Sequence, residues 1–181
     1  MAFLVAMAAS CATLGAGSTI AEQVDLRLDP AEWVLGERSG GPSATLTGYV
    51  PANQSAEQWT RFVTGETYAY AALPFPAVDE APQEQRSGLA ACCPGLRWNV
   101  ISRPRGGARY EWRTQGCEGV PDQHEVGRVT AGRRTWARIG STVTGSMDAA
   151  TRDEWIRRLE GARLIAPLVR RGAVTGPPRG R

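Results

Sequence analysis

The chain has 181 residues, of which 42% are hydrophobic and 22% are charged. This length and balance favour one globular domain with a real core and exclude a wholly disordered chain. The net charge of +3 is modest, and all 21 basic residues are arginine. Because these arginines are scattered along the chain, we attribute them to the composition of a GC-rich genome rather than to a phosphate-binding site.

The first 21 residues, MAFLVAMAASCATLGAGSTIA, contain no charged side chain. A short apolar run passes into small residues, which is typical of a signal peptide. The apolar run is too short and too rich in small residues to favour a transmembrane helix. We therefore expect residues 1–21 to be a signal peptide and the protein to be exported.

Two routes of signal processing stay open. Cys11 in MAASC stands where a bacterial lipoprotein is acylated, although Ala8 replaces the usual leucine. The small residues between Ala16 and Ala21 fit ordinary signal-peptidase cleavage instead. The sequence thus predicts either a lipoprotein anchored through Cys11 or a periplasmic protein.

The segment after the signal is expected to form a strand and then a short helix. Alternating β-formers predict a strand over Thr45–Val50, which Pro51 ends. Ser55 and Gln58 then form a capping-box pattern, which favours a helix start. The residues at helical spacing that such a helix would bury are Trp59, Phe62 and Val63.

The middle of the chain is expected to contain a strand, a loop and a helix. A strand is predicted over Thr67–Ala71, before Pro74 and Pro76. Residues 74–88 are rich in Pro, Glu and Gln and indicate a surface loop, with a short helix from about Pro82 to Ala91.

Two hairpins and a long helix are expected in the second half. Residues 96–102 and 108–114 pair across the Gly-containing loop RPRGG, and residues 124–130 pair with 133–145. Residues 148–165 predict a helix that Asp148 or Thr151 caps and Pro167 stops.

Together these elements predict an α+β fold. It has an antiparallel sheet of about five or six strands, packed with the C-terminal helix and one or two shorter helices. Residues 22–166 are expected to form this single domain. Residues 167–181 carry arginines and no acid, and we expect a disordered basic tail.

Three motifs together resemble a family of small, uncharacterised bacterial exported proteins, many of them assigned as lipoproteins. They are GYVPANQSAEQWTRFVT, then CPGL with YEWRTQGCEGVPDQHEVGRV, and finally DEWIRRLEGARL. The resemblance spans about residues 45–165. Some Trp-bearing exported domains of similar layout have a Mog1/PsbP-like α-β sandwich. The resemblance implies a compartment and a fold, and no activity.

Hairpin register predicts one disulfide. If the first loop is centred on Arg105, Trp98 faces Trp112 and Val100 faces Tyr110, and the same register places Cys93 opposite Cys117. In an oxidising envelope this pair forms a disulfide that closes a loop of about 25 residues.

The remaining cysteine, Cys92, could be buried or could pair with another molecule. Alternatively, Cys92 could be the reactive thiol of a thiol-active protein, which requires that it be exposed and near positive charge. No cysteine spacing suits structural zinc, and no Cys-x-x-Cys is present, so neither a metal nor a cofactor is expected.

The densest group of candidate catalytic residues is Asp122, His124 and Glu125. A histidine oriented by a carboxylate can act as a general base. However, no Gly-x-Ser-x-Gly or His-Glu-x-x-His motif supplies a nucleophile or a metal. We favour a polar cluster at the start of a strand, and a small envelope hydrolase using these residues is the alternative.

Two further patterns have a functional and a structural interpretation. Glu111 and Glu125 could be a carboxylate pair for glycoside chemistry, although Glu111 is better explained by pairing with Arg109 or Arg113. Export argues against nucleic acid as the partner of the arginines, and favours glycans or anionic surfaces. The arginines of the first hairpin are Arg97, Arg103, Arg105, Arg109 and Arg113.

The sequence therefore favours a non-catalytic exported domain of the bacterial envelope that binds another component. Its expected partners are an envelope protein, a glycan or an anionic surface, with no nucleic acid. Contact with the membrane is expected only through a lipid on Cys11.

Overall fold

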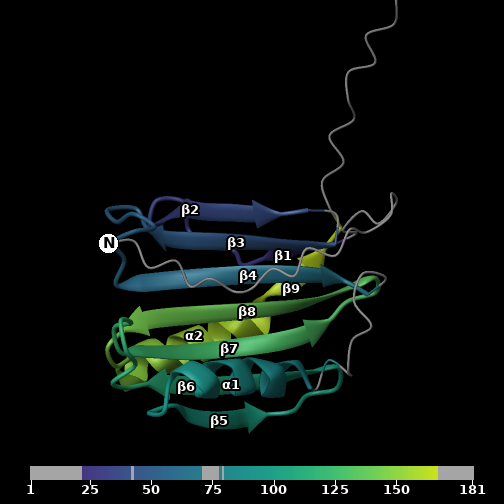
Figure 1. Cartoon of the computed structure of the whole chain (residues 1–181). Coiled ribbons are helices and arrows are strands. Elements are labelled where there is room, and N and C mark those ends of the chain that lie inside the picture. Colours follow the sequence, from purple (N-terminus) through teal and green to yellow (C-terminus); the bar gives the residue numbers. More distant parts are fainter. Residues whose placement is uncertain (1–21, 42, 71–77, 79, 167–181) are drawn as a thin grey trace, which may run out of the picture.

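The computed structural model describes residues 22–41, 43–70, 78 and 80–166, and its main feature is a seven-stranded antiparallel sheet (Figure 1). The strands lie in the order β2-β3-β4-β8-β7-β6-β5. Their bounds are β2 Trp33–Gly40, β3 Ala44–Pro51, β4 Arg61–Ala69, β5 Arg97–Ser102, β6 Gly107–Thr114, β7 Gln123–Ala131 and β8 Thr135–Thr144. A separate two-stranded ribbon pairs β1 (Gln23–Asp25) with β9 (Arg163–Ile165).

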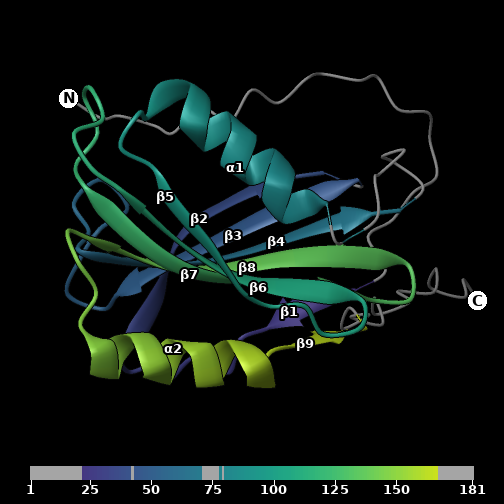
Figure 2. The ribbon, with the colours of Figure 1, turned by 90° about the horizontal axis from the view of Figure 1, so that it is seen from below.

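The sheet is the middle of three layers (Figure 2). Helix α1 (Ala81–Cys92) lies over one face, at the end formed by β5, β6 and β7. Helix α2 (Ala149–Gly161) and the β1–β9 ribbon lie on the opposite face. We call these the α1 face and the α2 face. Because side chains alternate along each strand, neighbouring residues of one strand belong to different faces.

The core of the α2 face is aliphatic, with two tryptophans. Helix α2 buries Trp155 and Leu159, four residues apart on one side of the helix. The Trp155 ring meets the Trp33 ring edge-on, with centroids 5.5 Å apart. The fully buried strand residues beneath are Val63, Val126, Ala137 and Ile139. Burying each Val or Ile side chain stabilises the fold by about 1.5–3 kcal/mol.

The core of the α1 face is built mainly from aromatic rings. Tyr68 stacks on Trp136 with centroids 4.1 Å apart, and Trp98 stacks on Tyr110 at 4.9 Å. Ala81, at the start of α1, packs against this group. The stacked rings bury a large apolar area and have few rotatable bonds. They form the apolar surface on which Ala81 and Leu89 of α1 pack.

Several predictions are confirmed. The fold is α+β, and α1 occupies the position expected from about Pro82 to Ala91. The first hairpin has the predicted register, with Trp98 opposite Trp112 and Val100 opposite Tyr110. Cys93 and Cys117 form a disulfide with Cα atoms 4.9 Å apart. Asp148 caps α2 by accepting the N–H of Thr151 at 2.9 Å.

The short helix expected around residues 55–63 is wrong. Ser55 and Gln58 form an isolated β-bridge within a turn, and β4 begins at Arg61. Phe62 and Val63 therefore point to opposite faces of the sheet instead of sharing a helix side. The segment is rich in Thr, Val, Phe and Tyr, and β4 pairs with β8 along its whole length, so β-propensity and tertiary pairing outweigh a short helical spacing.

The edges of the domain also differ from the sequence expectation. The helix expected to reach residue 165 ends at Gly161, and Leu164 instead belongs to β9. The β1–β9 ribbon joins the two ends of the described chain, and a single-sequence pattern contains no signal for so distant a pairing. β2 was not expected either, and with it the main sheet has seven strands.

Some predictions fall on other parts of the chain. The expected signal peptide at 1–21 with Cys11, and the expected tail at 167–181, lie outside the described residues. Within the described residues, neither helix has the length and apolar character needed to cross a bilayer.

Candidate functional site

His124 is completely buried on the α2 face, with 0% of its side chain exposed. Its Nδ1 accepts the backbone N–H of Met147 at 2.9 Å, so the proton of the neutral ring is on Nε2. Nε2 donates to Oε1 of Glu111 at 2.7 Å. Burial lowers the pKa of His124, and the contact with Glu111 only partly opposes this. The lowered pKa favours the neutral imidazole, and each of its two nitrogens already has a hydrogen-bond partner within the protein.

Glu111 is the centre of this cluster, which we call the His124 cluster. Arg152 of α2 donates two hydrogen bonds to its carboxylate, from Nε to Oε1 at 3.0 Å and from Nη2 to Oε2 at 2.8 Å. Arg113 lies 3.4 Å from the same carboxylate. The bonds from Arg152, against the opposing effect of burial, lower the pKa of Glu111 to about 2. The cluster fastens α2 to strands β6 and β7.

The three residues predicted as a catalytic group do not meet. Asp122 precedes β7 and is exposed, and its carboxylate accepts the N–H of Gly116 at 2.9 Å. Glu125 follows His124 on the same strand and therefore projects to the α1 face. Glu111 and Glu125 are likewise separated by the sheet, so they cannot flank one substrate as a carboxylate pair.

A second polar cluster lies under α1, and we call it the Glu125 cluster. Thr142 donates to Glu125 Oε2 at 2.8 Å, and Tyr110 donates to Oε1 at 3.1 Å. Next to them, Arg138 contacts Glu66 at 2.5 Å, and Tyr68 also donates to Glu66. Glu66, Tyr110, Glu125 and Thr142 are buried, and Tyr68 and Arg138 are half-buried.

Two glycines make space for the Glu125 cluster. A Cβ at Gly127 would overlap the Tyr110 ring, and a Cβ at Gly140 would come within 2.9 Å of Glu125 Cδ. Burial raises the pKa of Glu125, and the charge of Arg138 and the bonds from Thr142 and Tyr110 only partly offset this. Because both carboxylates are buried and hydrogen-bonded within the protein, the cluster has a structural role.

Cys92 is exposed at the end of α1. Its thiol points back to the carbonyls of Gly88 and Leu89, at 3.6 and 3.4 Å. Cys92 therefore has the exposure that the thiol-active interpretation requires, but the contacts of its thiol are with backbone carbonyls and not with basic side chains.

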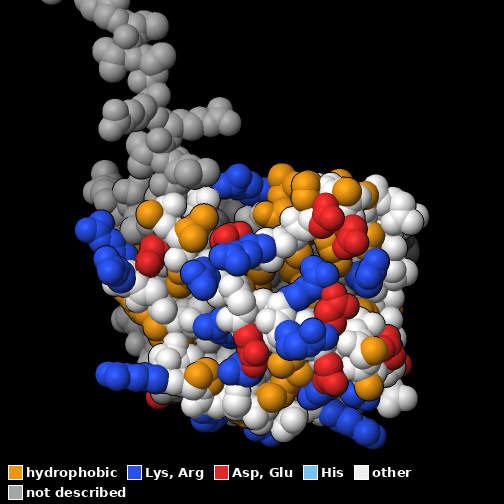
Figure 3. All heavy atoms as spheres, turned by 180° about the vertical axis from the view of Figure 1, so that it is seen from behind, with side chains coloured by type: hydrophobic (Ala, Val, Ile, Leu, Met, Phe, Trp, Pro, Cys, Tyr) orange, Lys and Arg blue, Asp and Glu red, His pale blue; other side chains and the backbone are white. Residues whose placement is uncertain are grey.

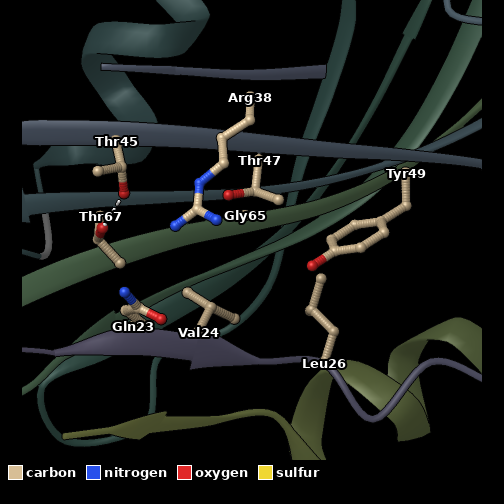
Figure 4. Close-up of a pocket in the computed structure, with 9 residues that line it drawn as sticks. All are labelled: Gln23, Val24, Leu26, Arg38, Thr45, Thr47, Tyr49, Gly65 and Thr67. Atoms are coloured by element: carbon tan, nitrogen blue, oxygen red, sulfur yellow. Dashed lines mark hydrogen bonds between the residues drawn. The ribbon is translucent and has the colours of Figure 1, made fainter. Parts of the chain in front are cut away.

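A cavity of about 100 Å³ lies between β1 and the α2 face of β2, β3 and β4 (Figure 4). Val24 and Leu26 form its apolar wall, and Gly65 forms part of its floor. The polar lining residues come from β1, β2, β3 and β4, and they are Gln23, Arg38, Thr45, Thr47, Tyr49 and Thr67. Sequence analysis missed this site, because its members are spread over strands whose pairing was not predicted.

The wall formed by β1 is held in place by Glu22. Its carboxylate accepts the backbone N–H groups of Arg133, Arg134 and Thr135 and the hydroxyl of Thr135, at 2.9–3.3 Å. Burial alone would raise the pKa of Glu22, but these bonds outweigh it and lower the pKa. Glu22 thus anchors β1 to the turn between β7 and β8.

Arg38 gives the cavity its charge. Its guanidinium points from β2 into the cavity, toward Thr47 and Gly65 (Figure 4). None of the residues that line the cavity is acidic, and Arg38 forms no ion pair with any residue in the described part of the chain. Elsewhere on the α2 face, Arg and acidic side chains are interleaved (Figure 3), and Arg109, for example, pairs with Glu160.

Among the described residues, no three His, Cys, Asp or Glu side chains are grouped so that they could hold a metal ion. Neither the known protein families nor the curated proteins contain a match to this chain. The candidate site therefore depends on geometry and charge alone.

Proposed function

We propose that this protein is an exported, non-catalytic binding domain of the bacterial envelope, and that the cavity beneath β1 is its binding site. The observation that carries the proposal is a polar cavity containing an arginine with no acidic partner among the described residues. Arg38 is exposed, so water stabilises its charge without a counter-ion, and the guanidinium stays available to a ligand in the cavity.

The compartment is supported by two independent features. Residues 1–21 have the composition of a signal peptide. The Cys93–Cys117 disulfide is of the kind that persists in exported proteins and is rare in the cytosol. Periplasmic and lipid-anchored forms remain two versions of the same proposal, which differ at Cys11.

The alternative, hydrolysis through His124, receives less support. A general base must reach the proton that it removes. His124 has no exposed surface, and a backbone N–H and Glu111 occupy its two nitrogens. Asp122 and Glu125 do not assist it, since neither contacts the ring in the described structure.

Export is tested by expressing the full chain in a bacterial host and fractionating the cells. We expect the protein in the envelope fraction, with Cys93 and Cys117 linked in a peptide map made without reductant. The intact mass of the mature form distinguishes an acylated Cys11 from cleavage further along. A cytoplasmic protein that retains Met1 and has both thiols free would refute export.

Binding is tested by NMR on the ¹⁵N-labelled mature protein, with a low-molecular-mass extract of the envelope as the probe. We expect shifts confined to cavity residues on β1, β3 and β4. The Gly65→Ala variant should reduce them, because a Cβ there meets Val24 at an ordinary contact distance of 3.5 Å and fills the floor without a clash. Shifts that avoid the cavity, or that Gly65→Ala leaves unchanged, would contradict this site.

A further inference from the structure

We infer that the cavity beneath β1 takes the oxyanion group, a carboxylate or a phosphate, of a small ligand. This inference rests on the proposed function and adds the chemical class of the ligand. It is carried by three properties of the cavity: its charge, its hydrogen-bond donors and its size.

The charge of the cavity is positive. The Arg38 guanidinium is a planar fork of N–H donors that suits two oxygens of one carboxylate or phosphate. Of the acidic residues close to the cavity in the sequence, Asp25 pairs with Arg27 and Glu22 binds the β7–β8 turn, while Glu37 precedes Arg38 on β2 and projects to the α1 face. Glu66 follows Gly65 but projects to the α1 face, where it pairs with Arg138. An anion would therefore meet Arg38 without competition from these carboxylates.

The neutral groups of the cavity can add donors to the same anion. The Thr45 and Thr67 hydroxyl oxygens are 2.6 Å apart, so one of them donates to the other and the second keeps its proton for a ligand. The Thr47 hydroxyl and the Gln23 amide also line the cavity (Figure 4). A cation would be repelled by Arg38, and a wholly apolar group would leave these polar atoms without partners.

The size of the cavity limits the bound group. In this measure one water molecule needs about 10–15 Å³, so a cavity of about 100 Å³ has room for several water-sized groups. A carboxylate or a phosphate fits this space, while the rest of its ligand would extend past Arg38, whose side chain is exposed. Gly65 and Val24 close the inner side.

The test is an NMR titration of the ¹⁵N-labelled mature protein in a HEPES buffer at constant ionic strength. Inorganic phosphate and acetate are the probes. We expect saturable shifts at Thr45, Thr47 and Thr67 with at least one of these anions. Tighter binding of phosphate assigns the ligand to the phosphate-bearing class, and tighter binding of acetate assigns it to the carboxylates.

Two matched variants test the role of Arg38. Arg38→Gln should weaken anion binding about tenfold or more, because a hydrogen bond to a charged group is lost. Arg97→Gln is the control, since Arg97 is also an exposed arginine on an edge strand of the same sheet, and it should leave the affinity unchanged. Equal weakening in both variants would show a general charge effect and overturn the inference.

The outcomes separate this inference from the proposed function. No saturable shift with either anion, while envelope extract still shifts the same cavity residues, refutes the oxyanion and keeps the binding site. Loss of both responses refutes the site itself. Thermal unfolding of each variant at the wild-type temperature confirms that lost binding is not lost folding.

Discussion

The two polar clusters lie on opposite faces of one sheet, and they shift the pKa values of their carboxyl groups in opposite directions. His124 and Glu125 are adjacent in the chain, yet one faces α2 and the other faces α1. In the His124 cluster, the pKa of Glu111 falls to about 2. In the Glu125 cluster, the pKa of Glu125 rises.

The difference comes from the available cations. Glu111 receives two bonds from Arg152 and lies near Arg113, and the contact with His124 adds a donor. Glu125 receives neutral donors, namely the hydroxyls of Tyr110 and Thr142 and the Gln85 amide at 3.5 Å, because Arg138, the nearby cation, is paired with Glu66. Burial by itself raises the pKa of a carboxyl, and a directly bonded arginine reverses this.

The largest expected effect is from Arg138→Met, which removes the cation of the Glu125 cluster. Two buried carboxyls would then lack a counter-charge, and the free energy of unfolding should fall by about 3–5 kcal/mol at pH 7. Urea unfolding followed by tryptophan fluorescence measures this. Arg97→Met is the exposed control and should change the stability by less than about 0.5 kcal/mol. A loss no larger than the control's would show that Arg138 does not support the cluster.

Glu111→Gln tests the opposite cluster and should cost about 1–3 kcal/mol at pH 7, since Arg152 loses a charged acceptor. A lowered carboxyl pKa stabilises the fold above the ordinary value of 4.5, and that contribution is lost as the pH falls from 4.5 toward 2. The difference between wild type and variant should therefore shrink over this range. A difference that stays constant from pH 5 to pH 2 would contradict the assigned pKa.

Glu125→Gln should change the stability by only about 1 kcal/mol or less, because the amide oxygen can still accept from Thr142 or Tyr110. Its pH dependence has the other sign. A raised carboxyl pKa stabilises the fold below 4.5, and this contribution is lost as the pH rises through the raised pKa. Wild type should thus lose stability relative to the variant as the pH rises above 4.5. Parallel unfolding curves for Glu111→Gln and Glu125→Gln would remove the distinction between the two clusters.

The smallest effect is a change in the titration of His124, the single histidine of the chain. Its ring protons should titrate below the ordinary value of 6.5 in one-dimensional NMR, because burial disfavours the charged ring. Stability gained by keeping the ring neutral is present above pH 6.5 and is lost as the pH falls below it. In Glu111→Gln the pKa should fall further, since Glu111 favours the charged form. A value at or above 6.5 would mean that the ring is open to solvent.

The parts of the fold that sequence reasoning predicted are those with short connections. The register of β5 and β6 followed from the position of one loop, and it led to the Cys93–Cys117 disulfide. The cap at Asp148 likewise depends on residues within one helical turn. Such features follow from the stereochemistry of a few consecutive residues.

The candidate site could not be predicted in the same way. Gln23, Arg38 and Thr67 line one cavity, but they come from strands that are brought together by the sheet and by the β1–β9 ribbon. The bond between Arg152 and Glu111 joins a helix to a strand far away in the chain. No spacing in the sequence relates these residues to one another.

By itself, the sequence determined the α+β class, the two hairpins, helix α1, the start of α2 and the cysteine pair, because alternation, capping and short loops act locally. Only the tertiary structure decided that Phe62 and Val63 belong to a strand rather than to a short helix, since pairing with β8 supplies bonds that a short helix lacks. The tertiary structure also decided that the His124 side chain is buried while the Arg38 side chain is exposed to solvent. The accessibility of a side chain depends on which distant elements cover it, and that is a property of packing.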